Sequence, residues 1–210
     1  MAKSPSIGIS SRKQPKQARS NELVSAVLEA AARVLAAEGA HRFTTARVAE
    51  KAGVSVGSLY QYFPNKASIL FRLQSDEWQR TTALLRRLLE NRDQSPFDRL
   101  RALVHAFILS ECEEADLRVA LADAAPLYRD APETGDAKGE GDDIIQSFID
   151  EILPQASLAT RTTVAELIGS TFASVGKDFS EEPRTPAEIA IFSDAMADMF
   201  CAYLRHLQTP

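Results

Sequence analysis

Side chains suited to binding a nucleic acid gather in one short stretch of the chain, residues 43–70. Positions 56–62 read Val-Gly-Ser-Leu-Tyr-Gln-Tyr. Serine and glutamine can hydrogen-bond base edges, and serine and tyrosine hydroxyls can bind phosphate oxygens, whereas a helix that only faces solvent more often carries lysine and glutamate. We therefore interpret the stretch as a DNA-binding surface with these contact residues: Thr44, Thr45, Val56, Gly57, Ser58, Tyr60, Gln61, Tyr62 and Lys66.

Local signals around this surface predict two short helices, a tight turn and the start of a third helix. Thr44 and Ser55 can cap helix N-termini, and Gly53 suits the left-handed position that ends a helix. Pro64 is expected to end the second helix, and Asn65 to cap the third. The apolar residues that should face inwards are Val48, Ala49, Ala52, Leu59 and Phe63. This is the pattern of a helix-turn-helix whose second helix enters a major groove.

Two runs of residues resemble a known family. They are T-T-x-x-V-A-x-x-A-G-V-S from Thr44 to Ser55 and G-S-L-Y-x-Y-F-x-N-K from Gly57 to Lys66. In these runs the chain resembles the TetR family of transcriptional repressors, and the resemblance spans roughly residues 21–81. It implies a homodimer on a double-stranded DNA operator, controlled by a small molecule.

The chain departs from the family pattern at two positions. Val56 stands where a polar or basic residue is common, and Ala46 stands where some members carry a base-reading arginine. Val56 either loses a contact or packs on a thymine methyl group. The operator sequence therefore cannot be inferred from the resemblance.

Charge is divided unevenly along the 210 residues, although the net value is only −5. Residues 1–70 hold ten Lys and Arg against four Glu, so 14 of the 24 basic and 25 of the 29 acidic side chains fall in the remainder. A basic first part joined to an acidic body predicts one DNA-binding domain and one domain of another kind.

The basic, acid-free residues 1–19 are expected to form a disordered arm. The arm is either a solubilising tail or a phosphate contact through residues 12–19. Residues 20–66 are expected to form the three-helix DNA-binding domain, and residues 67–210 an effector-binding and dimerisation domain. The whole chain is predicted to be all-α, with about nine helices. The acidic, glycine-containing segment from Arg129 to Asp143 is expected to be a mobile loop.

The last two predicted helices, residues 158–175 and 186–207, carry more apolar residues than one pair of helices can bury. A four-helix bundle made from two subunits can bury them, and recognition of a palindrome also needs two-fold symmetry. The predicted dimer interface comprises Val164, Leu167, Ile168, Thr171, Val175, Phe192, Met196, Met199, Phe200 and Tyr203.

A ligand pocket between the middle helices is implied by the resemblance. An aromatic, apolar stripe supplies its candidate lining, although such a stripe is also typical of a plain core. The candidates are Trp78, Leu103, Phe107, Tyr128, Ile145, Phe148, Ile149 and Phe172. We expect an apolar or amphipathic effector that releases a repressor from its operator, with the helix of residues 65–90 as the mechanical link.

Other functional classes find less support. The three histidines show no metal-ligand spacing, and the run from Gly169 to Lys177 fails as a phosphate loop because its glycine spacing is wrong. We expect no enzyme activity, cofactor or metal. A helical interaction protein that has lost DNA binding is the remaining alternative. Two distant cysteines, and no signal peptide or membrane-spanning run, favour the cytoplasm.

Overall fold

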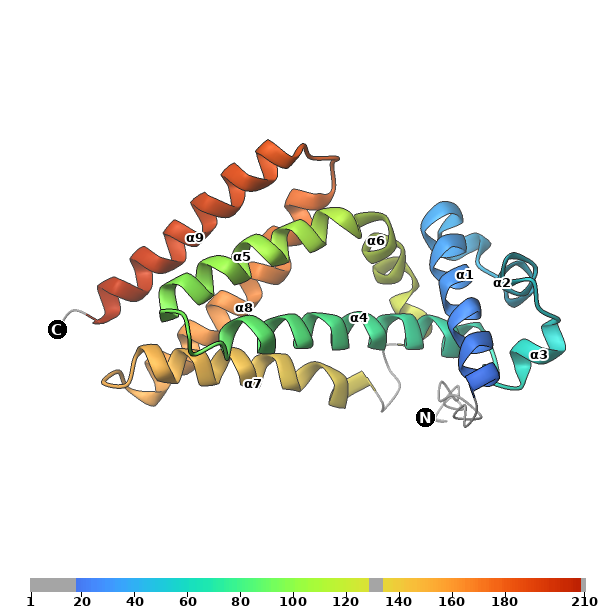
Figure 1. Ribbon diagram of the computed structural model, residues 1–210, viewed down its shortest axis with the longest axis horizontal. Helices are drawn as coiled ribbons and strands as arrows, with labels where there is room; N and C mark the ends of the chain where they lie inside the picture. Colours follow the sequence, from blue (N-terminus) through green and yellow to red (C-terminus); the bar gives the residue numbers. More distant parts are fainter. Residues whose placement is uncertain (1–17, 129–133, 209–210) are drawn as a thin grey trace, which may run out of the picture. The chain divides into compact units, whose positions relative to one another are not determined.

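The computed structural model describes residues 18–128 and 134–208, which form α-helices, one 3-10 turn and no strand (Figure 1). The nine described α-helices confirm the predicted all-α class. In chain order the elements are α1 (Ala18–Arg42), α2 (Thr45–Ala52), α3 (Val56–Tyr60), α4 (Lys66–Leu89), α5 (Pro96–Glu113), α6 (Ala115–Ala124), η1 (Ala125–Leu127), α7 (Thr134–Ile152), α8 (Leu158–Ser180) and α9 (Pro186–Gln208). The predicted basic arm lies outside the described residues, apart from the start of α1.

The chain divides into two compact units. The first comprises Met1–Glu77 and Asp116–Ala137, and the second comprises Trp78–Ala115 and Lys138–Pro210. The division therefore falls inside α4, eleven residues beyond the predicted boundary at position 66. The reason is packing, because the first half of α4 and the whole of α6 share one apolar core with α1, α2 and α3.

The core of the first unit is built on α1. Val27, Ala31 and Leu35 recur at four-residue steps on one face of this helix and are fully buried. Gly39 interrupts the helix with φ 74° and ψ 170°, a conformation open to glycine but strained for other residues. The chain then turns so that Phe43, 1% exposed, closes the same core.

Polar contacts fasten α6 and η1 to α4 within the first unit. Arg118 lies 2.5 Å from Glu77, and the hydroxyl of Tyr128 lies 3.1 Å from both the Leu121 carbonyl and Oε1 of Gln74. Burial raises the pKa of Tyr128 to about 12, so its hydroxyl remains a donor at neutral pH. The prediction that Tyr128 lines a pocket with residues of α5, α7 and α8 is therefore corrected, since it belongs to the core of the first unit.

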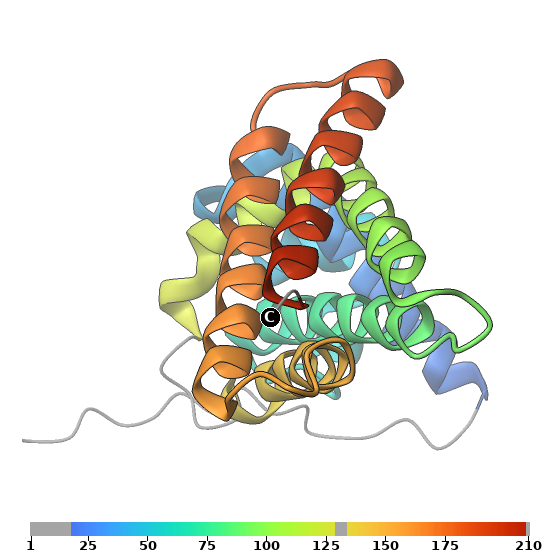
Figure 2. The ribbon, with the colours of Figure 1, turned by 90° about the vertical axis from the view of Figure 1, so that its left-hand side faces the viewer.

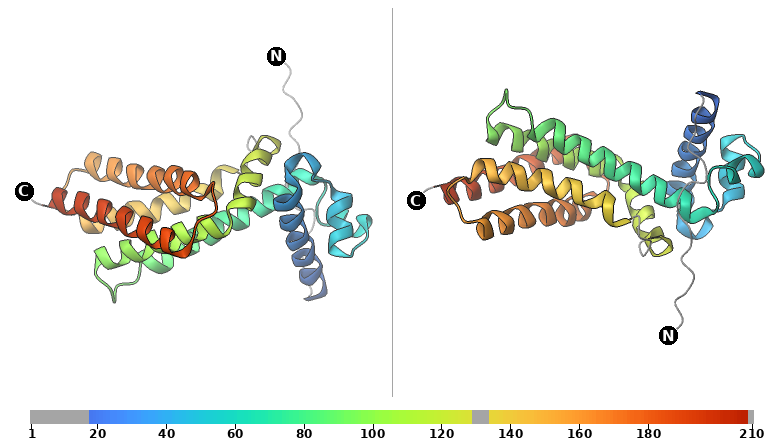
Figure 3. Two further views of the ribbon diagram at one scale, coloured as in Figure 1. Left: turned by 90° about the horizontal axis from the view of Figure 1, so that it is seen from above. Right: turned by 90° about the horizontal axis from the view of Figure 1, so that it is seen from below.

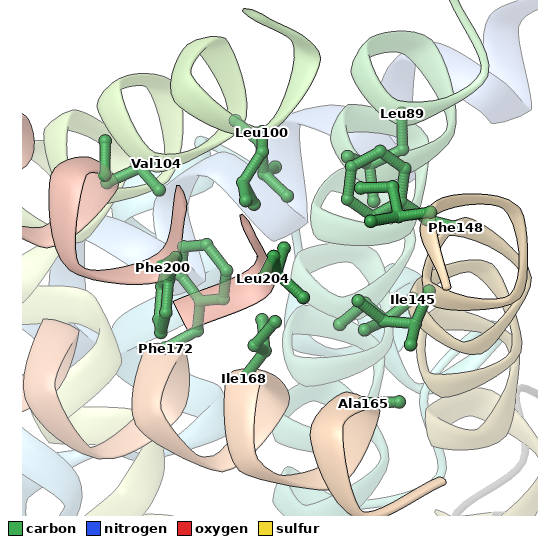
Figure 4. Packing of buried hydrophobic residues seen from close by; sticks show 14 of the residues in the cluster. Leu89, Leu100, Val104, Ile145, Phe148, Ala165, Ile168, Phe172, Phe200 and Leu204 are labelled. Carbon is green, nitrogen blue, oxygen red and sulfur yellow. The ribbon is translucent and has the colours of Figure 1, made fainter. Parts of the chain in front are cut away.

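The second unit is a bundle in which α5 packs against both α8 and α9. Apolar side chains from α4, α5, α7, α8 and α9 meet in its core (Figure 4). The helices α8 and α9 form an antiparallel pair (Figure 2). Phe179 at the end of α8 stacks on Phe192 of α9, with ring centroids 3.9 Å apart, and this contact fixes the hairpin.

The predicted loop between Arg129 and Asp143 is corrected from Thr134 onwards, because α7 begins there. Residues 129–133 lie outside the described residues. Glycine lowers helix propensity by only about 1 kcal/mol per residue, and packing can offset that. The helix α7 runs beside α4 (Figure 3), and a methyl group at Gly141 would make an ordinary contact with Cδ1 of Leu85, 3.4 Å away. Arg86 also pairs with Glu140 at 2.6 Å.

Two helix ends differ from the predicted ones. The helix α8 continues to Ser180, five residues beyond the expected end at Val175. In contrast, α3 ends at Tyr60, before Pro64 is reached. The amides of Gln61 and Tyr62 bond three residues back, at 3.3 and 3.0 Å, and this tighter turn ends the regular helix.

Candidate nucleic-acid interface

The first helix of the motif, α2, begins and ends where the sequence predicts. Thr44 is its N-cap, with its hydroxyl accepting a 3.3 Å hydrogen bond from the amide of Arg47. Gly53 is its C-cap, with φ 68° and ψ 28°, and the cap amide bonds back to the carbonyls of Ala49 and Glu50. These local bonds define the direction in which the chain enters the turn.

The second helix, α3, is short and depends on its N-cap. The hydroxyl of Ser55 accepts a 3.0 Å hydrogen bond from the amide of Ser58 and lies 2.8 Å from the Ser58 hydroxyl. Leu59 is fully buried and anchors the helix on the core of the first unit. The cap and this one side chain hold a five-residue helix on the surface.

Four predicted contact residues share the outer face of α3 and its C-cap. Val56 and Tyr60 are 39% and 40% exposed, and Gly57 and Gln61 are exposed as well. Their spacing of one, three and one residues places them on one side of a helix, away from buried Leu59. The structure therefore gathers glycine, valine, phenol and amide groups on a single surface that can approach a duplex.

Ser58 and Tyr62 are half-buried on the opposite side of this segment. The Ser58 hydroxyl is already bonded to Ser55, and Tyr62 packs against the core of the first unit. Their predicted contacts with DNA remain untested, but neither side chain lies as open as that of Gln61.

The hydroxyls of Thr45 and Tyr60 lie 3.1 Å apart, with either oxygen able to donate. Thr45 is the first residue of α2 and Tyr60 is the last residue of α3. This bond ties the two helices of the motif together across their exposed ends. Nothing in the sequence signalled it, because two residues fifteen positions apart share no helical period.

Cationic groups around the motif are partly neutralised by acids. Arg42 and Arg47 both pair with Glu38 of α1. Lys66 is the first residue of α4, is exposed and forms no ion pair with another described residue. Asn65 caps that helix by accepting a 2.8 Å hydrogen bond from the amide of Ser68. Lys66 thus lies at a helix N-terminus, where positive potential favours an anion such as phosphate.

The ten predicted interface residues divide into two groups. Four of them lie in the core of their own chain and are at most 5% exposed, and their assignment to an interface is corrected: Val164, Ile168, Met196 and Phe200. The other six are half-buried or exposed: Leu167, Thr171, Val175, Phe192, Met199 and Tyr203. Leu167 and Met199 stand out among these because they are 48% and 53% exposed. The sequence of an apolar helix face does not show which of its residues pack in the chain's own core and which remain available for a dimer interface.

Six of the predicted pocket residues lie together in the core of the second unit: Leu103, Phe107, Ile145, Phe148, Ile149 and Phe172. The rings of Phe107 and Phe172 meet edge to face, with centroids 4.9 Å apart. Trp78 is half-buried on α4. The carboxylate-bearing side chain of Glu111, 6% exposed and one turn from Phe107, was not among the predicted residues.

The residues considered for phosphate binding, redox chemistry or metal binding all lie within α-helices. Residues 169–177 lie inside α8, so the weak likeness to a phosphate loop does not correspond to a loop. Burial raises the pKa of the thiols of both Cys112 and Cys201. His105 lies 3.0 Å from Asp194 in an exposed pair between α5 and α9. Within the described residues no cluster of His, Cys, Asp or Glu is arranged to hold a metal ion.

Two protein-family models match the chain. Residues 27–73 match the model described as bacterial regulatory proteins of the tetR family. Residues 95–207, just over half of the chain, match the model described as the tetracyclin repressor-like C-terminal domain. In the part of the chain with described structure, none of the helices is long and apolar enough to cross a membrane.

Some individual proteins are similar to part of the chain in sequence or to most of it in structure. The nucleoid occlusion factor SlmA of Vibrio campbellii is 32% identical over 83 residues, which are 39% of this chain and 42% of that protein. A TetR-family regulator from Mesorhizobium loti has a similar structure, with TM-score 0.68 and 16% identity over 89% of this chain and 98% of that one. NalD of Pseudomonas aeruginosa, the secondary repressor of the MexAB-OprM multidrug efflux pump, gives TM-score 0.60 and 16% identity over 89% and 96%. The matched models and structures describe transcriptional regulators, not enzymes.

Proposed function

The chain belongs to the TetR family of DNA-binding transcriptional regulators, and from that premise we propose that it is a ligand-responsive repressor. Its homodimer binds a palindromic operator, and an apolar or amphipathic small molecule releases it. The main support for sequence-specific DNA binding is that Val56, Gly57, Tyr60 and Gln61 are exposed together on the outer face of α3. Small, hydroxyl and amide groups on a capped helix fit a major groove.

Gln61 is proposed to read a base edge. Glutamine can make a bidentate pair with adenine, and such a pair contributes about 1–3 kcal/mol of discrimination. We expect Gln61→Ala to weaken binding to the operator by that amount and to weaken binding to random duplex DNA much less. The operator is first selected from a randomised duplex library, and both affinities are then measured by fluorescence anisotropy. Equal losses on the two DNAs would assign Gln61 to the DNA backbone instead.

Lys66 is proposed to bind a phosphate without reading sequence. Each phosphate neutralised by a lysine releases a counterion, so removing one contact from each subunit lowers the slope of log K against log salt by about one unit per subunit, or about two for the dimer. Lys66→Ala should show this change on operator and random DNA alike. Lys177→Ala, an exposed lysine of α8, is the matched control and should leave the slope unchanged. An unchanged slope for Lys66→Ala would remove this residue from the interface.

Dimerisation is proposed to use the outer faces of α8 and α9. Leu167 and Met199 expose apolar surface on these two helices, and the helices pair antiparallel in the chain (Figure 2). A two-fold contact would join two such pairs as a four-helix bundle. Two recognition helices about 34 Å apart could then meet successive major grooves on one side of the duplex.

Effector release is proposed to act through the core of the second unit. A ligand shifts an equilibrium only by binding one state more tightly than another, so it need not touch DNA. The proposed site surrounds Phe107, which contacts Phe172 and packs close to Gly176 of α8. The helix α4 contributes residues to both units and is the proposed mechanical link.

A pair of phenylalanine substitutions tests this site. Once a compound that releases the operator has been found in a metabolite and drug panel, Phe107→Leu should raise the concentration for half release about fivefold, because a ring contact contributes roughly 1 kcal/mol. Phe179→Leu, in the α8–α9 hairpin, should leave that concentration unchanged. Operator affinity without ligand should stay near wild type in both. Equal shifts in the two variants would place the ligand elsewhere.

A further inference from the structure

In the hydrogen bond between Thr45 and Tyr60, one hydroxyl donates and the other accepts. Hydroxyl pairs have a direction, since one O–H donates to the other oxygen and the second O–H remains free to donate outwards. The structure fixes the pair at 3.1 Å but leaves the direction open. A DNA phosphate requires one of the two hydroxyls to donate outwards, because its oxygens only accept hydrogen bonds.

Exposure decides which of the two hydroxyls donates outwards. Tyr60 is 40% exposed on the outer face of α3, whereas Thr45 is half-buried at the start of α2. This difference favours the phenol as the outward donor, with the threonine hydroxyl donating to the phenol oxygen. A hydroxyl that accepts one hydrogen bond becomes a better donor in the next, since neighbouring bonds polarise each other.

We propose that Thr45 is a positioning residue, which holds and polarises the hydroxyl of Tyr60 so that this phenol donates to a DNA phosphate. The inference rests on the proposed DNA-binding face of α3 and adds a task for Thr45 that differs from direct contact. It also accounts for how a five-residue helix, anchored by Leu59 and its N-cap, keeps its last residue in a defined place. The bond joins that residue to a separate helix.

A double-mutant cycle on the selected operator tests the proposal. Thr45→Val keeps the shape of the side chain but removes its hydroxyl, and Tyr60→Phe removes the phenol oxygen. Tyr60→Phe is expected to weaken binding about tenfold per half-site, the size expected for a hydrogen bond to a charged acceptor. Thr45→Val is expected to weaken it by less, because the phenol can still donate. The double variant should be no weaker than the weaker single variant, because both changes break the same chain of bonds. Thr45→Ser restores a hydroxyl and should recover most of the affinity.

Further measurements separate this role from a structural one. Thermal unfolding should show that all the variants remain folded, and Thr81→Val, a half-buried threonine of α4, is the matched control with unchanged affinity. Because both hydroxyls are neutral, the salt slope should remain that of the wild type in Thr45→Val and Tyr60→Phe. If Thr45→Val misfolds, Thr45→Ala removes the same hydroxyl and takes its place in the cycle.

Three results would overturn the proposal. They are wild-type affinity in Thr45→Val, losses that add in the double variant, and a Thr45→Ser variant as weak as Thr45→Val. The proposed DNA-binding face fails separately. If Gln61→Ala, on the same face, weakens binding while Tyr60→Phe does not, the face stands and the positioning role is wrong. If neither variant changes affinity, the face itself is wrong.

Discussion

Glu151→Ala is expected to lower the free energy of unfolding by about 3 kcal/mol, because it leaves a buried charge without its partner. The charge is that of Arg99, which is 1% exposed. Its guanidinium pairs with Glu151 of α7, donates to the carbonyl of Leu89 and lies 5.4 Å from the ring centroid of Phe148. The pair thus joins α4, α5 and α7 inside the second unit.

A surface pair on the same helix is the control for this prediction. Glu140 of α7 pairs with Arg86, and both side chains are exposed, so Glu140→Ala should change stability little. Chemical denaturation followed by circular dichroism measures both variants. Arg99→Met, which removes the charge and keeps much of the volume, should be less damaging than Glu151→Ala. Equal stability of the two alanine variants would show that Arg99 finds water or another partner.

The helix-turn-helix was predictable because its signals act over a few residues. Thr44, Ser55 and Asn65 all cap the helices expected of them, and Gly53 takes the expected left-handed conformation. Each of these choices depends on backbone groups within about four positions, so the sequence alone contains the whole argument. The buried residues Leu59 and Phe63 follow from the same local periodicity.

The start of α7 was not predictable, because it depends on a distant part of the chain. Acidic residues and glycines between positions 134 and 143 favour a loop when they are considered alone. In the structure the segment is helical and lies beside α4, with Gly141 near Leu85 and Glu140 paired with Arg86. Packing of this kind overrides propensity, and no local pattern announces it.

It was easier to predict which residues are buried than to predict which of the two cores contains them. Tyr128 and Phe172 were both candidates for one apolar pocket or for a plain core, and both are at most 4% exposed. They belong to different compact units, however, because α6 and η1 join the first unit. Similarly, the Thr45–Tyr60 bond depends on how α2 meets α3, which residue types alone do not specify.

The dimer prediction has the largest expected effect on DNA binding. Leu167→Glu on α8 and Met199→Glu on α9 should each convert the dimer to monomers, because a two-fold contact repeats the substitution and places two like charges in one apolar interface. A monomer loses the high effective concentration that the second half-site provides, so operator affinity should fall at least roughly a hundredfold. Sedimentation velocity and fluorescence anisotropy measure the two effects on the same samples.

The choice of residues in this experiment comes from the structure. Phe200→Asp, the natural choice from the sequence pattern, would place a charge in the protomer's own core, since Phe200 is 3% exposed and packs on Phe172. The control is Leu109→Glu on α5. Leu109 is 43% exposed in the same unit and lies on neither proposed interface helix. It should leave both the dimer and operator affinity intact. Dimers that persist in both Leu167→Glu and Met199→Glu would mean that two-fold assembly uses another surface of the second unit.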